Sequence, residues 1–122
     1  MDYTVKLAYQ SNYWYNDGLA KAQVRDMSGA ITSLKKSLQY NRANLAARNL
    51  LGLVYFEMGE AVSALGEWVI SQNLRPKKNI ANDYIDMIQN NQARLDGINQ
   101  TIKKYNQALA YCWQDSQDLA VI

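Results

Sequence analysis

Signals for a pair of helices are concentrated in residues 51–76, which read LGLVYFEMGEAVSALGEWVISQNLRP. Most of these residues favour or tolerate a helix, and Gly59 interrupts them with a backbone that adopts turn conformations easily. Pro76 cannot continue a helix, because its ring removes the N–H donor and clashes with the preceding turn. The stretch therefore predicts two antiparallel helices, at about 45–58 and 60–73, with a turn at Gly59.

The same features recur about 34 residues earlier, which is a period typical of helical solenoids. Displacing the sequence by this period superposes identical residues, and the pairs are Gly18 with Gly52, Leu19 with Leu53, Ala30 with Ala64, and Ser37 with Ser71. Small residues are needed where helices cross closely, because a larger side chain would push the helix axes apart. We therefore expect an earlier pair of helices at about 12–24 and 28–40.

In this pattern the sequence resembles the tetratricopeptide repeat (TPR) family. The second unit carries most of the resemblance, at Leu51, Gly52, Tyr55, Gly59, Ala64, Trp68 and Pro76. The first unit matches at Trp14, Gly18, Ala30, Leu34 and Ser37. A third copy is indicated by the likeness of Tyr15-Asn16-x-x-Leu19-Ala20 to Tyr105-Asn106-x-x-Leu109-Ala110. The resemblance implies an all-α fold, a TPR-like α-solenoid of antiparallel helix-turn-helix repeats.

We expect the repeats to be followed by a long helix. After Pro76, apolar residues spaced alternately by three and four fall on one helical stripe, at Tyr84, Ile88, Leu95, Ile98, Ile102, Tyr105, Leu109 and Cys112. The first part of this helix should shield the end of the second repeat. The predicted single domain, 1–122, thus comprises repeat one at 11–44, repeat two at 45–78, an inserted long-helix segment at 79–100 and a truncated third repeat at 101–122. A coiled-coil seam between two chains is the alternative for the stripe.

The composition argues against several classes of function. The 13 Lys and Arg residues are spread along the chain, so they create no concentrated basic field of the kind that binds nucleic acid. With one cysteine and no histidine, the chain lacks an intramolecular disulfide, the usual zinc ligands and the commonest catalytic base. No glycine-rich phosphate loop occurs. We expect no enzyme activity, no cofactor, no metal and no nucleic-acid partner.

No apolar run approaches the roughly 18 residues that a membrane span requires, so we expect no direct membrane insertion in this segment. The single cysteine favours a reducing compartment. We therefore expect a cytoplasmic location, while a longer natural protein could carry a signal or an anchor outside this chain.

The resemblance also implies a ligand surface, because the first helix of each TPR lines a concave groove. In the first unit, the corresponding positions are Asn12, Tyr15, Asn16, Leu19 and Gln23. In the second and third units they are Asn49, Leu53, Phe56, Glu57, Tyr105, Asn106, Leu109 and Trp113. Amide side chains both donate and accept hydrogen bonds, and aromatic rings give rigid apolar contact. We expect a protein-interaction scaffold that binds a protein or peptide of unknown identity in this groove.

Two alternatives stay open. The groove side chains could instead pack on the long helix after Pro76, which would leave no free site. The chain could also be a self-assembly element, in which the long C-terminal helix and the apolar end formed by Ala120, Val121 and Ile122 drive homo-oligomer formation.

Overall fold

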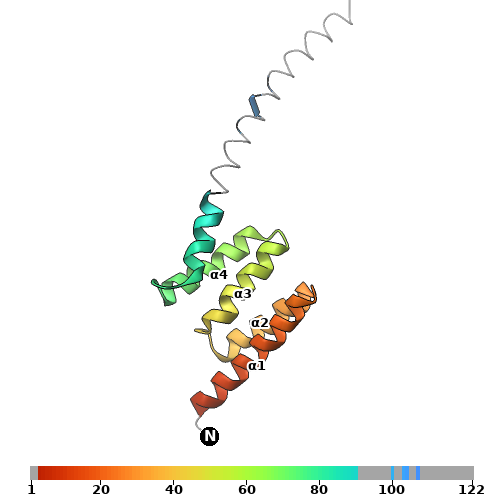
Figure 1. Cartoon of the computed structure of the whole chain (residues 1–122), viewed down its shortest axis with the longest axis vertical. Helices are drawn as coiled ribbons and strands as arrows, with labels where there is room; N and C mark the ends of the chain where they lie inside the picture. Colours follow the sequence, from red (N-terminus) through yellow and green to blue (C-terminus); the bar gives the residue numbers. More distant parts are fainter. Residues whose placement is uncertain (1–2, 91–99, 101–102, 105–106, 108–122) are drawn as a thin grey trace, which may run out of the picture. The chain divides into compact units, whose positions relative to one another are not determined.

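A computed structural model of the chain describes residues 3–90, 100, 103–104 and 107, and all regular structure in this part is α-helical. The helices are α1 (Tyr3–Gln23), α2 (Met27–Tyr40), α3 (Leu45–Glu57) and α4 (Ala61–Leu74). A fifth helix begins at residue 80 and is described through residue 90. The chain divides into two units, Met1–Ile88 and Gln89–Ile122, and the packing below is that of the first. In that unit α1 packs along α2 and α3 packs along α4 (Figure 1), which confirms the predicted all-α fold.

The turns between the helices have clear local causes. The side chains of Asp26 and Asn44 cap α2 and α3, because each accepts a hydrogen bond from the free backbone N–H three residues later. Gly59 has a φ of 80° in the turn before α4, a conformation that costs glycine little. Helix α4 ends two residues before Pro76. The bounds expected for α2, α3 and α4 therefore agree with the structure to within one residue.

The expected start of the first helix was wrong. Helix α1 begins at Tyr3 rather than at residue 12, and no glycine or proline interrupts the intervening residues. Ser11 could have capped a helix that started at residue 12. Its hydroxyl instead donates to the backbone oxygen of Ser37 on α2, at 2.9 Å, and Ser11 is completely buried. The helix therefore continues through this serine.

The first hairpin closes around Gly18. A Cβ atom at this position would lie 2.7 Å from Cγ of Leu34, so only glycine lets α1 approach α2 this closely. Leu34 and Ala30, both on α2, are completely buried in the first core cluster. At the edge of this hairpin, Nζ of Lys36 lies 4.1 Å from the centroid of the Trp14 ring, a cation–π contact that joins the two helices.

The second hairpin closes around Gly52. A Cβ atom there would overlap the indole ring of Trp68, which is completely buried. The indole Nε1 donates a hydrogen bond of 3.1 Å to the backbone oxygen of Asn49, one turn earlier on α3. Ala64 is also completely buried. The small residues predicted at helix crossings thus lie where α3 and α4 pack.

The fifth helix completes the second core cluster. Ala81 and Ile85 are buried against Trp68, whereas one repeat period earlier Ala47 and Leu51 are buried in the first cluster. The start of the fifth helix therefore covers α4 in the way that α3 covers α2. The division of residues 79–122 into an inserted segment and a third repeat remains a prediction, because most of them lie outside the described residues.

Of the apolar stripe predicted for the long helix, the structure describes Tyr84 and Ile88, and both pack against the second core cluster. The ring centroids of Tyr84 and Trp68 are 5.0 Å apart. The other stripe residues lie outside the described residues, and so does any coiled-coil seam that they would form.

The close approach at Gly52 can be tested against Gly66, a matched glycine on α4 whose added Cβ would meet nothing within 4 Å. We expect Gly52→Ala to lower the free energy of unfolding by about 1–3 kcal/mol, because the methyl group would displace the indole ring. Gly66→Ala should raise it by about 0.5–1 kcal/mol through the better helix propensity of alanine. Urea denaturation followed by circular dichroism measures both changes, and a stabilising Gly52→Ala would refute the packing described here.

Candidate protein-interaction surface

The structure describes the predicted groove residues of the first two units. The exposed members are Asn12, Asn16, Gln23 and Glu57. The half-buried members are Tyr15, Leu19, Asn49, Leu53 and Phe56. The four positions of the third unit, Tyr105, Asn106, Leu109 and Trp113, lie outside the described residues. The described part of the predicted groove therefore lies on α1 and α3.

On α1 the polar groove residues remain largely available to a ligand. The amides of Asn16 and Gln23 are exposed, and neither makes a side-chain hydrogen bond to any other described residue. Oδ1 of Asn12 accepts one bond of 3.3 Å from Nδ2 of Asn44. Tyr15 packs against the first core cluster, so its ring also supports the fold. The exposed amides are the groups on α1 that suit hydrogen bonding to a peptide backbone.

On α3 the groove residues are partly engaged within the chain. Nδ2 of Asn49 donates to Oδ1 of Asn79 at 3.1 Å. Leu53 and Phe56 pack against the second core cluster, together with Tyr84 and Ile88. The segment that begins the fifth helix therefore covers part of the predicted surface of α3.

A small hollow lies between the C-terminal halves of α1 and α3. Its volume is about 120 Å³, and its lining residues are Ala22, Arg25, Met27, Leu50, Leu53, Val54 and Glu57. Two of these, Leu53 and Glu57, belong to the predicted groove. The hollow has an apolar floor and a charged rim, which suits one aliphatic side chain of a ligand.

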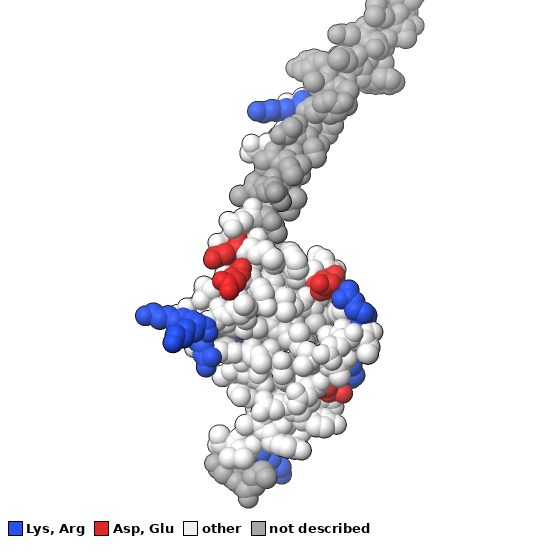
Figure 2. Space-filling model, viewed as in Figure 1, with Lys and Arg blue, Asp and Glu red and all other residues white. Residues whose placement is uncertain are grey.

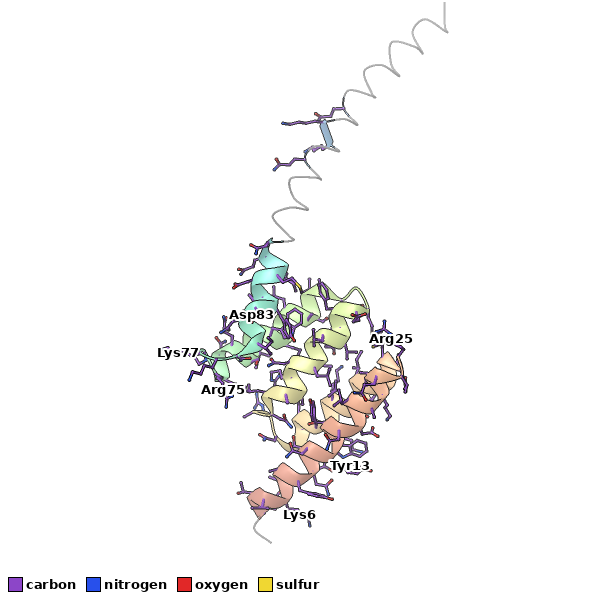
Figure 3. The ribbon with its side chains drawn as sticks, viewed as in Figure 1. Lys6, Tyr13, Arg25, Arg75, Lys77 and Asp83 are labelled. Atoms are coloured by element: carbon purple, nitrogen blue, oxygen red, sulfur yellow. The ribbon has the colours of Figure 1, made fainter. Side chains whose placement is uncertain are left out.

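The rim of this hollow carries an ion pair that the sequence did not reveal. Nη2 of Arg25 lies 3.2 Å from Oε2 of Glu57, and both side chains are mainly exposed. Arg25 stands in the turn after α1 (labelled in Figure 3) with a φ of 67°. The signal available in the sequence was its position in the predicted turn, but the pairing across the hairpins required the fold. An exposed pair contributes little to stability, so Glu57 is free to exchange partners.

The face seen in Figure 2 is largely uncharged. Lys and Arg side chains lie at the edge that carries Arg75 and Lys77 in Figure 3, at the opposite edge that carries Arg25, and near Lys6, while acidic side chains lie near Asp83 and at the edge that carries Arg25. Charge on this face is therefore confined mostly to its margins.

One polar network fixes α1 on α2 beside the candidate surface. Nζ of Lys21 lies 2.8 Å from Oδ2 of Asp17 and donates to Oγ of Ser33 at 3.1 Å, and Ser33 in turn donates to Asp17. The hydrogen bond from Lys21, and then the one from Ser33, lower the pKa of Asp17 below its ordinary value. The hydrogen bond to Asp17 raises the pKa of Lys21. The hydrogen bonds among Asp17, Lys21 and Ser33 thus account for both pKa shifts.

Within the described ranges, no cluster of three or more His, Cys, Asp or Glu side chains could hold a metal ion. None of the helices within those ranges has the length and apolar character needed to cross a membrane.

The network predicts a pH dependence of stability. Because folding lowers the pKa of Asp17, its ionised form stabilises the fold above the ordinary value of 3.8, and this contribution is lost as the pH falls through the lowered pKa. We expect Asp17→Asn to lower the urea midpoint at neutral pH, and the gap from the wild type to narrow progressively as the pH falls below 3.8. Asp83→Asn is the control, since Asp83 is exposed and forms no ion pair within the described residues. A gap for Asp17→Asn that persists unchanged in acid would show that its charge plays no such role.

Comparison with known proteins supports the fold. No protein family model and no curated protein matches the sequence. The crystal structure of MamA, a TPR-like helical protein, matches with a TM-score of 0.66 and 24% sequence identity. The match covers 75% of this chain and 51% of MamA, so the chain spans about half the length of that protein. At this level of identity the likeness is one of fold, and the chain has the TPR-like helical fold.

Proposed function

We propose that this chain is a non-catalytic protein-interaction scaffold, which binds a peptide or protein segment along α1 and α3. The observation that carries the proposal is the hollow of about 120 Å³ between these two helices, at the positions where a TPR-like fold presents its ligand surface. Repeat scaffolds use one frame for many partners, and the side chains along the groove determine the specificity.

The chemistry of the surface favours an extended peptide. The exposed amides of Asn16 and Gln23 both donate and accept, so they can pair with a peptide backbone whose own N–H and C=O groups alternate. An aliphatic side chain of the peptide would enter the hollow beside Leu53. Glu57 could leave Arg25 to bind a basic residue of the ligand at little cost, because the pair is exposed.

The titratable groups with shifted pKa values are engaged in structural contacts, which agrees with a scaffold role. The two groups with shifted pKa values, Asp17 and Lys21, pair with each other and with Ser33 rather than opening onto a hollow. TPR-like folds generally serve as scaffolds rather than as enzymes. These features support binding rather than catalysis.

Self-assembly remains the alternative function, now with an additional observation. Val5, Tyr9 and Tyr13 lie four residues apart along α1 and are 53%, 65% and 54% exposed. This spacing places them on one face of the helix, where they form an apolar stripe that a second chain could cover. The C-terminal residues on which the alternative was first based lie outside the described part.

The groove can be tested with charge substitutions that leave the core intact. We expect Asn16→Arg combined with Gln23→Arg to abolish capture of the natural partner, because both amides are exposed and the added charges would occupy the peptide path. Asn73→Arg, at an exposed position on α4, is the matched control and should capture normally. Affinity capture followed by mass spectrometry identifies the partner, and hydrogen exchange should show its protection on α1 and α3. Equal capture by all three proteins would place binding elsewhere.

A further inference from the structure

A larger hollow lies between α2, α3 and α4, and it shares no residue with the surface proposed above. Its volume is about 450 Å³, and its lining residues are Lys35, Leu38, Gln39, Arg42, Arg48, Leu51 and Glu67. Pockets for small ligands typically measure about 300–1,000 Å³. Three cationic side chains face one carboxylate in this lining, so the hollow attracts negative charge.

Arg48 is the fixed cation of the hollow, and it is only 8% exposed. Its Nη1 donates to Oε2 of Glu67 at 2.7 Å, and its Nη2 donates to the backbone oxygen of Arg42 at 2.9 Å. Its Nε is buried and has no hydrogen-bond partner within the described residues. A buried guanidinium that retains an unpaired donor is an incompletely satisfied charge, and a second carboxylate nearby would stabilise it.

Lys35 and Arg42 supply the exposed cations. Both line the hollow, and neither forms an ion pair with any residue that the structure describes. A charge-assisted hydrogen bond from either side chain to a carboxylate is about twice as strong as a neutral one. The one internal contact of these two cations is a cation–π contact of Lys35, whose Nζ lies 6.0 Å from the centroid of the Tyr55 ring, so among the described residues an acidic group displaces no ion pair.

The uncharged lining residues are Leu38, Leu51 and the polar Gln39, and the two leucines favour an apolar neighbour beside the acidic group. Leu38 and Leu51 are 9% and 1% exposed, so they form a packed floor rather than a loose surface. An aliphatic side chain laid on this floor would remove its own apolar area from water. The hollow thus combines cations with an apolar floor, which matches a peptide with acidic and aliphatic residues side by side.

We propose that this hollow is a second binding site, which takes an acidic segment of a partner protein. A carboxylate of the segment binds between Lys35 and Arg42, and a neighbouring aliphatic side chain rests on Leu38. Charge complementarity identifies the occupant. A nucleic acid fits less well, because two exposed cations neutralise too few phosphates and Glu67 repels a polyanion. The site is independent of the groove along α1 and α3.

Glu67 has a defined part in this site. Its carboxylate pairs with Arg48 and also adds a negative charge to the lining, so it repels an incoming carboxylate. Removing the charge of Glu67 removes this repulsion and should tighten the binding of an acidic segment. Binding to a general basic surface would not depend on this one acidic residue. A rise in affinity when Glu67 is neutralised therefore identifies the hollow as the binding site.

The probe is a short fluorescein-labelled peptide whose core alternates glutamate with leucine, compared with a copy in which glutamine replaces glutamate. Fluorescence anisotropy with the full chain measures the dissociation constants. We expect the acidic peptide to bind at least about tenfold more tightly than the glutamine copy, the loss expected for one charge-assisted contact. Arg42→Glu should weaken binding of the acidic peptide by at least about tenfold, and Glu67→Gln should strengthen it by a few-fold.

Arg75→Glu is the matched control, since it makes the same change of charge at an exposed residue outside the hollow, and it should leave the affinity nearly unchanged. The combination of Asn16→Arg and Gln23→Arg should also have no effect, which separates this site from the groove. Equal affinity for the two peptides, no binding of the acidic peptide, or an equal loss in Arg42→Glu and Arg75→Glu would overturn the proposal. Displacement of the peptide by a lower concentration of a single-stranded oligonucleotide would overturn it as well.

Discussion

The contact between the indole of Trp68 and the backbone of α3 at Gly52 holds the second hairpin together. The ring lies where any side chain at Gly52 would stand, and its Nε1 donates to the backbone oxygen of Asn49. Its environment includes Tyr84 from the fifth helix. Because α3 also contributes Leu51 to the first core cluster, the position of α3 against α4 determines how the two hairpins stack. Both proposed sites depend on this stacking.

Polar links reinforce the stacking at the point where one repeat passes to the next. Asn44 caps α3, and Oδ1 of Asn79 accepts a hydrogen bond from the backbone N–H of Ala81 at the start of the fifth helix. The amide of Asn44 also donates to the buried hydroxyl of Ser11, at 2.9 Å, and that of Asn79 donates to Oγ of Ser71, at 2.9 Å. Each asparagine therefore satisfies a buried hydroxyl while starting a helix, so the order of the helices is fixed by specific hydrogen bonds as well as by apolar burial.

Local signals explain which parts of the fold were predictable. The turn at Gly59 and the stop at Pro76 depend on backbone properties of single residues, so α3 and α4 were placed nearly correctly. The start of α1 had no such signal. The site was less predictable, because the amide of Asn49 is already bonded to Asn79, a contact set by the path of the loop between α4 and the fifth helix. The second hollow was not foreseen, since its charged residues stand far apart in sequence and meet only when α2, α3 and α4 pack.

The most direct measurement is hydrogen exchange at the indole N–H of Trp68, followed by nitrogen-15 correlation spectra and assigned by the signal missing from Trp68→Phe. We expect this proton to exchange only when the hairpin unfolds, because the indole is completely buried and bonded to α3. Its protection should therefore match that of the backbone amides in the centre of α3. Exchange as fast as that of a free indole would contradict the packing of Trp68 on Gly52 and, with it, the stacking on which both sites rest.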